Sequence, residues 1–189
     1  MSITDIIAFL AFIVALYSAT LSTYTAINEF FRLKIFAINP NKNFVTLSMS
    51  DYYQEEGEPT PIFNKNKYTI GILVRITNKS KNSTTINEIL LNKKYAINSS
   101  SKFDCWYPIS FRCIEDCLAT HESKNLDYPC IKPLLKLNPL TSYECYLIFD
   151  NIDTFPSKFS ITINTVQKSK KFRLKTSITN DYRNSIIPE

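Results

Sequence analysis

Hydrophobic and polar positions divide this chain into two unlike parts. No charged residue interrupts residues 6–28, which lie between Asp5 and Glu29, and residues 6–16 of that stretch, IIAFLAFIVAL, are entirely apolar. As an α-helix rising about 1.5 Å per residue, the stretch reaches roughly 34 Å, enough to cross a hydrocarbon core about 30 Å thick. The pattern therefore predicts an N-terminal transmembrane helix.

Two other interpretations of this segment fit the sequence less well. A cleaved signal peptide begins with basic residues, but residues 1–5 contain no Lys or Arg. An amphipathic helix on a soluble core has a polar face, which the first four turns lack. All 22 Lys and Arg follow the segment, and basic residues near a span stay on the cytoplasmic side. We therefore expect a single-pass protein of the cell membrane whose large domain is cytoplasmic.

Beyond residue 40, apolar and polar residues alternate in short runs. The clearest run is KYTIGILVRITN at residues 67–78, where one face carries Tyr68, Ile70, Ile72, Val74 and Ile76. Four other segments show similar alternation, at residues 45–49, 142–150, 159–163 and 172–174. Short strands between polar turns, with little helical periodicity, predict an all-β domain.

These patterns predict the architecture of the whole chain. We expect an antiparallel, immunoglobulin-like sandwich at residues 40–189, preceded by residues 1–39 as a single transmembrane helix with an interfacial linker. The least strand-like part is residues 103–137, which contain four of the five Cys and the only His. We interpret it as a Cys-rich insertion with a short helix at residues 114–119.

Three features of the chain resemble a class of uncharacterised bacterial membrane proteins. Asp5 precedes the span, GILVRITNKSKNSTTINEI has the form of a strand, a turn and a strand, and in LNPLTSYECYLIFDNI a Pro-bearing turn precedes an aromatic-rich strand. The resemblance covers most of the chain outside the Cys-rich region. It implies an uncleaved N-terminal span and an immunoglobulin-like domain, and it implies no catalytic residues.

The sharpest candidate site lies in CIEDCLATH. On a helix, Cys113, Cys117 and His121 would share a face, and with Cys130 they would supply the four ligands of a tetrahedral zinc site. The spacing departs from the tight Cys-x₂-Cys pattern of structural zinc sites. Free thiols packed as small apolar groups, or one disulfide in an oxidising compartment, are the alternatives.

A second candidate is a set of basic residues that could contact anionic lipid headgroups. Arg32 and Lys34 follow the span, and QKSKKFRLK places Lys171, Arg173 and Lys175 on one side of a strand. The alternative is an exposed strand whose Lys residues prevent pairing with other chains.

Small residues recur along the predicted span at every fourth position, at Ala11, Ala15, Ala19 and Thr23. Such a stripe lets helix backbones approach closely, so it predicts a homo-oligomer or a partner helix. The alternative is an ordinary lipid-facing surface.

Several function classes lack their signals in this sequence. With two Gly in all, no phosphate-binding Gly loop is present, and no Ser-His-Asp pattern accompanies the lone His121. Basic and aromatic residues do not alternate as in single-strand nucleic-acid binders. We therefore expect a non-enzymatic, membrane-anchored protein-interaction module of a bacterium or phage, with no nucleic-acid partner and no cofactor other than a possible zinc ion. The alternatives are a membrane effector or exclusion factor in phage–host conflict, and a Cys-based redox or zinc sensor.

Overall fold

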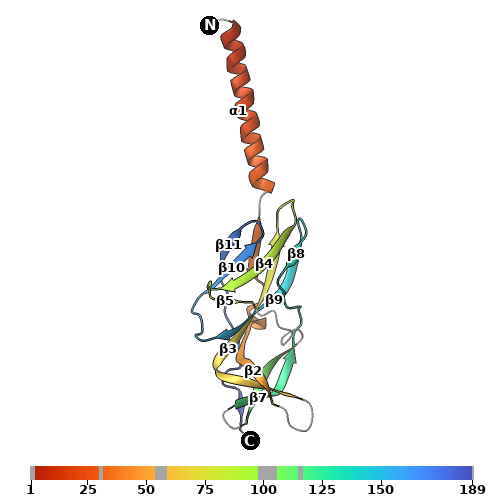
Figure 1. Ribbon diagram of the computed structural model, residues 1–189, viewed down its shortest axis with the longest axis vertical. Coiled ribbons are helices and arrows are strands. Elements are labelled where there is room, and N and C mark those ends of the chain that lie inside the picture. The colour runs from red at the N-terminus through yellow and green to blue at the C-terminus, as the bar shows by residue number, and fades with distance from the viewer. Residues whose placement is uncertain (1–2, 30–31, 54–58, 98–105, 115–116, 189) are drawn as a thin grey trace.

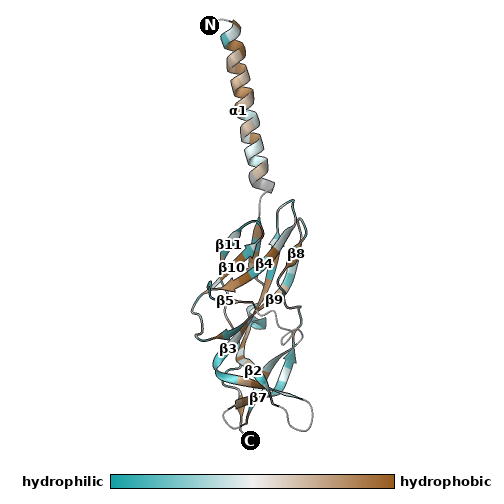
Figure 2. Ribbon diagram, viewed as in Figure 1, coloured by the Kyte–Doolittle hydropathy of each residue, from teal (hydrophilic) through white to brown (hydrophobic). Residues whose placement is uncertain are grey.

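One N-terminal helix and a mostly β domain make up the computed structural model, which describes residues 3–29, 32–53, 59–97, 106–114 and 117–188 (Figure 1). The helix α1 (Ile3–Glu29) contains a segment, Ile3–Ala26, that is long and apolar enough to cross a membrane. Its apolar character is strongest in the N-terminal half and fades toward the domain (Figure 2).

Threonine hydroxyls in the paler half of α1 form hydrogen bonds within the helix. Thr20 Oγ1 donates to the Leu16 carbonyl at 3.0 Å, and Thr25 Oγ1 donates to the Leu21 carbonyl at 2.8 Å. Hydroxyls bonded back to the preceding turn need no water. The Ser- and Thr-rich half therefore remains compatible with a lipid environment.

Two sheets form the β-domain. The first contains β1 (Leu33–Ala37), β2 (Phe44–Tyr53), β3 (Thr60–Asn78), β6 (Trp106–Ile114), β7 (Cys117–Asn125), β9 (Ser142–Ile152), β12 (Asn180–Asp181) and β13 (Ile186–Ile187). The second contains β4 (Thr84–Leu91), β5 (Tyr95–Ala96), β8 (Leu135–Leu137), β10 (Phe159–Thr165) and β11 (Ser169–Leu174). A 3₁₀ turn at Pro40–Lys42 joins β1 to β2.

The long strand β3 connects the two ends of the domain. Its N-terminal part pairs with β2 and β7, and its C-terminal part lies between β1 and β9. Nineteen residues of extended chain span about 60 Å. The strand can therefore belong to two different sheet neighbourhoods along its length.

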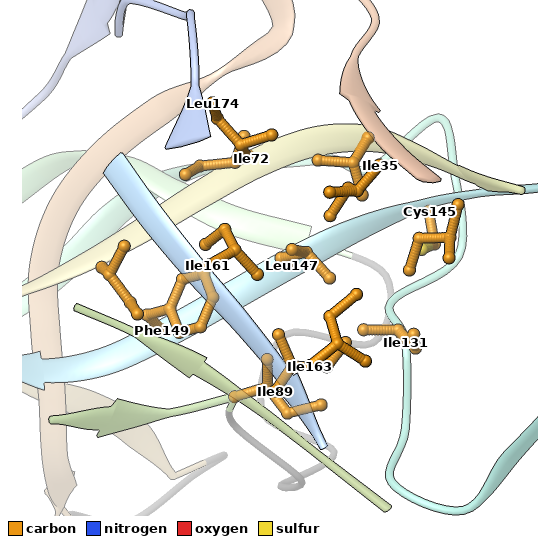
Figure 3. Packing of buried hydrophobic residues seen from close by; sticks show 14 of the residues in the cluster. Ile35, Ile72, Ile89, Ile131, Cys145, Leu147, Phe149, Ile161, Ile163 and Leu174 are labelled. Atoms are coloured by element: carbon orange, nitrogen blue, oxygen red, sulfur yellow. The ribbon is translucent and has the colours of Figure 1, made fainter. Parts of the chain in front are cut away.

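The largest apolar cluster lies where the two sheets face each other (Figure 3). Ile72 of β3 and Leu147 of β9 meet Ile89 of β4 and Ile161 of β10, and all four are fully buried. The predicted face of the 67–78 run is confirmed, because Ile70, Ile72, Val74 and Ile76 all lie in this cluster. The alternation of apolar and polar residues in the sequence therefore predicted correctly which side chains of β3 face the core.

The Cys-rich region differs from the sequence-based expectation. The short helix predicted at residues 114–119 is wrong: β6 ends at Ile114 and β7 begins at Cys117, and the two strands pair as an antiparallel hairpin. β7 also pairs with β3 through Phe63 and Leu118. These strands therefore extend the first sheet rather than forming a separate insertion.

Two further details of the predicted architecture need correction. Residues 33–37 form β1, which pairs with β3, so the β structure begins before the expected boundary at residue 39. The sheets are also mixed rather than purely antiparallel, because β12 pairs parallel with β2 and β13 pairs parallel with β6. Both parallel pairs come from the C-terminal tail, which returns along the first sheet.

Candidate functional site

Three of the predicted basic residues line one hollow on the second sheet. Lys171, Arg173 and Lys175 surround a space of about 520 Å³ together with Lys158. The remaining lining residues are Ser157, Phe159, Ser160, Leu174 and Thr176, so the lining contains no carboxylate to neutralise the four cations. We call this feature the basic hollow.

The β10–β11 hairpin brings these residues together. Phe159 pairs with Leu174, and both side chains belong to the core cluster. Because strand side chains alternate, the residues next to each of them face the other way. Lys171 and Arg173 thus project from the outer surface, as the sequence predicted.

Lys158 was not identified from the sequence. It lies thirteen residues before Lys171 and reaches the hollow only because the hairpin register places the start of β10 beside the end of β11. The alternating runs at residues 159–163 and 172–174 predict two strands, and pairing them with each other would have placed Lys158 beside the end of the second run.

The other two predicted lipid-contact residues, Arg32 and Lys34, do not line the basic hollow. Arg32 directly precedes β1, and Lys34 is exposed on that strand, paired in register with Thr77. Both are near the end of α1, whereas β11 leads away from its own turn for about 20 Å before reaching Lys175. β11 begins beside β1, where Lys170 Nζ donates to the Leu33 carbonyl at 3.2 Å, so the five predicted lipid-contact residues spread from the end of α1 along β11 rather than meeting at one place.

The four predicted zinc ligands do not converge. Cys113 pairs across from Leu118 and packs against an apolar cluster, while Cys117 pairs with Ile114, one position along, so the two thiols point to opposite faces of the hairpin. His121 lies four strand residues from Cys117, about 13 Å away. Cys130 lies in another part of the sheet, where its backbone forms an isolated parallel β-bridge with Tyr146.

No metal-binding group is evident in the part of the chain that the structure describes, where no three His, Cys, Asp or Glu residues come together. Among the described residues, no disulfide joins Cys113, Cys117, Cys130 and Cys145 to one another, and Cys105 lies outside the described residues. Burial raises the pKa of Cys145 to about 12. Its thiol therefore stays protonated at neutral pH and packs as a small apolar group.

The stripe of small residues lies along α1. Thr23 Oγ1 donates to the Ala19 carbonyl at 2.8 Å, and both residues border a shallow hollow on the helix surface together with Thr20 and Tyr24. Self-association through this surface stays a prediction.

Comparisons with known proteins give no relative for this chain. No family model matches it, and no curated protein matches it. It is similar to two solved structures of a GH20 exo-β-N-acetylglucosaminidase from Vibrio harveyi, one in complex with N-acetylglucosamine and one of an inactive mutant. Identity is 14% in both cases, the matches cover 79% and 75% of this chain, and the TM-scores are 0.21 and 0.20.

The chain spans about a fifth of the length of these enzymes, with 20% and 18% of their residues covered. Similarity at this level assigns neither a fold nor an activity to the chain. Its function has to be argued from its own surface.

Proposed function

We propose that this chain is a membrane-anchored, non-enzymatic interaction module that binds an acidic segment of a partner protein in the basic hollow. The observation that carries the proposal is the charge of the hollow: four cations surround it and no carboxylate is among its lining residues. Opposite charge on a partner would stabilise the complex and speed its association.

The residues that line the basic hollow also favour a binding role over a catalytic one. The basic hollow contains no Cys, His, Asp or Glu, the side chains that most often act as general acid or base. Lys and Arg, by contrast, hold carboxylates through charge-assisted hydrogen bonds. The hollow is therefore equipped to bind an anionic group rather than to transform one.

Anchoring and orientation complete the proposal. An apolar helix of sufficient length supports a single membrane crossing, and the basic residues that closely follow it, Arg32, Lys34 and Lys42, support a cytoplasmic domain. We further propose that the fold is immunoglobulin-like, since two sheets enclose the main core cluster. On this arrangement the helix fixes the protein in the bilayer, and the sandwich presents the basic hollow to cytoplasmic partners.

Charge reversal in the hollow tests the binding proposal. The full-length protein, in detergent micelles, is titrated with a fluorescent polyglutamate peptide, and binding is followed by anisotropy. We expect Lys171→Glu/Arg173→Glu to weaken binding about tenfold or more, since each tenfold loss corresponds to about 1.4 kcal/mol and two charge-assisted contacts are lost.

The matched control is Arg112→Glu/Lys124→Glu, which makes the same change in charge on β6 and β7. Both residues are exposed there, and neither lines the basic hollow. The control should leave binding within about twofold, because neither residue lines the hollow and salt screens the interactions of exposed charges more than about 10 Å apart. Equal weakening by both double variants would show that net charge attracts the peptide and would overturn the assignment to the hollow.

A further inference from the structure

The end of the β-domain nearest α1 carries two of the three most exposed large hydrophobic residues that the structure describes in the domain; the third, Leu134, precedes β8 and is 72% exposed. β1 begins at Leu33, four residues after α1 ends at Glu29, and four residues extend at most about 14 Å. Three turns meet at this end: the β3–β4 turn (79–83), the β8–β9 turn (138–141) and the β10–β11 turn (166–168) (Figure 1). We call these turns and the start of β1 the anchored end.

Strand register fixes the position of these turns. Asn78, directly before the β3–β4 turn, pairs with Leu33 at the start of β1. At the start of β4, Thr84 pairs with Leu137 of β8, and Ile86 pairs with Thr165 of β10. The turns that follow β8 and β10 therefore lie on either side of β4, separated by about two strand spacings, or 10 Å.

A buried asparagine ties the anchored end together. The Asn78 side-chain nitrogen donates to the carbonyls of Asn82 at 2.8 Å and Asn138 at 3.1 Å, and its oxygen accepts from the Ser80 amide at 3.0 Å. The Leu140 amide in turn donates to the Ser80 carbonyl at 3.3 Å. Two of the turns are thus held together by buried and part-buried hydrogen bonds of Asn78.

Apolar side chains project from this framework. Leu140 is 74% exposed and Val166 is 75% exposed, which makes them the two most exposed large hydrophobic residues that the structure describes in the β-domain. Leu140 also has a φ of 54°, a left-handed conformation that favours Gly or Asn over Leu. In water neither the backbone nor the side chain of Leu140 is in a favourable environment.

Positive charge surrounds these two tips. Lys79, Lys81 and Lys168 are exposed in the same turns, and the three turns contain no Asp or Glu. Exposed apolar side chains combined with Lys are the pattern by which proteins bind the interface of an anionic bilayer. The covalent link to α1 holds that interface within reach.

We propose that the anchored end docks on the surface of an anionic bilayer, with Leu140 and Val166 inserted among the headgroups and the three lysines against the lipid phosphates. The inference rests on the membrane anchor proposed above. It gives the domain a defined orientation, in which the C-terminal end of β3 lies near the lipid and its N-terminal end lies far from it. The basic hollow, near the far end of β11, is then left accessible to a partner.

Tryptophan substitutions in the full-length protein test this docking. Leu140→Trp and Val166→Trp are reconstituted in vesicles of phosphatidylcholine and phosphatidylglycerol whose acyl chains are brominated near the headgroup. Tyr52→Trp is the control: Tyr52 is 44% exposed and pairs with Pro61 at the end of β3 that lies far from the anchored end. After subtraction of the wild-type emission from Trp106, we expect bromine to quench about half of the added emission in the first two variants and almost none in the control.

Charge reversal and extraction separate the outcomes. In the Leu140→Trp background, Lys79→Glu/Lys81→Glu should reduce the quenching, while Arg112→Glu/Lys124→Glu should not. If carbonate-resistant protein shows no more quenching at Leu140 and Val166 than at Tyr52, the docking inference is wrong while the anchor stands. If carbonate releases the wild-type protein from the vesicles, both the anchor and the docking inference are overturned.

Discussion

Replacing Val74 by aspartate is expected to unfold the β-domain. Val74 is fully buried in the cluster between the two sheets, where it pairs in register with Cys145 of β9. A carboxylate there would lie among apolar side chains without a hydrogen-bond partner, at a cost of several kcal/mol. That cost is comparable to the 5–15 kcal/mol by which a typical domain is stable. Far-ultraviolet circular dichroism and urea denaturation of the full-length protein in detergent would measure the loss.

The neighbouring residue provides the control. Arg75 points to the opposite face of β3, where its Nε donates to Glu144 Oε1 at 2.8 Å. An exposed ion pair of this kind contributes about 0–1 kcal/mol, so Arg75→Gln should shift the unfolding free energy by no more than that. Equal tolerance of Val74→Asp and Arg75→Gln would show that the assigned facing of β3 is wrong.

The second large effect is expected at Gly71. A Cβ atom at this position would lie 2.2 Å from Cε1 of the Phe44 ring, which pairs directly with Gly71 in register. That ring is fully buried and stacks on Tyr107 with 3.9 Å between ring centroids, so moving it aside would disturb the packing around it. Forcing a methyl group into a packed core typically costs about 1–3 kcal/mol, and we expect Gly71→Ala to lower the unfolding free energy by about 2–3 kcal/mol.

A double-mutant cycle identifies the cause of that destabilisation. Phe44→Leu removes the ring and is itself destabilising, because it leaves a cavity against Tyr107. If the clash is responsible, Phe44→Leu/Gly71→Ala should be more stable than the sum of the two single effects predicts, by about 1 kcal/mol or more. Simple additivity would assign the effect of Gly71→Ala to the backbone rather than to Phe44.

The parts of the fold that the sequence predicted are those with uninterrupted alternation. β3, β9 and β10 each bury one face against the main cluster, and a period of two is sufficient to recognise such strands. The hairpin of β6 and β7 was missed because register shifts on both sides of Ser110 break the alternation of β6. The four-residue spacing of Cys113 and Cys117 then imitated a helical face.

Other parts of the fold depend on pairing between strands that are distant in the sequence, which a local hydrophobic pattern does not predict. β1 was missed because Phe36 is exposed beside the buried Leu33 and Ile35, so the segment resembled an interfacial stretch. β12 and β13 are two residues long, too short for any periodicity. The same reasoning applies to the basic hollow: Lys171, Arg173 and Lys175 follow from the alternation of one strand, whereas Lys158 follows only from the register of the hairpin.

Alkaline carbonate extraction of membranes from cells that express the full-length protein tests the central claim, that the N-terminal helix anchors this domain in a bilayer. We predict that the wild-type protein remains in the membrane pellet. Ile13→Lys/Leu16→Lys, which places two charges within the span at about 2.5–3.5 kcal/mol each, should move it to the soluble or degraded fraction. The matched Ile13→Leu variant should behave as wild type. Release of the wild-type protein by carbonate would contradict the account.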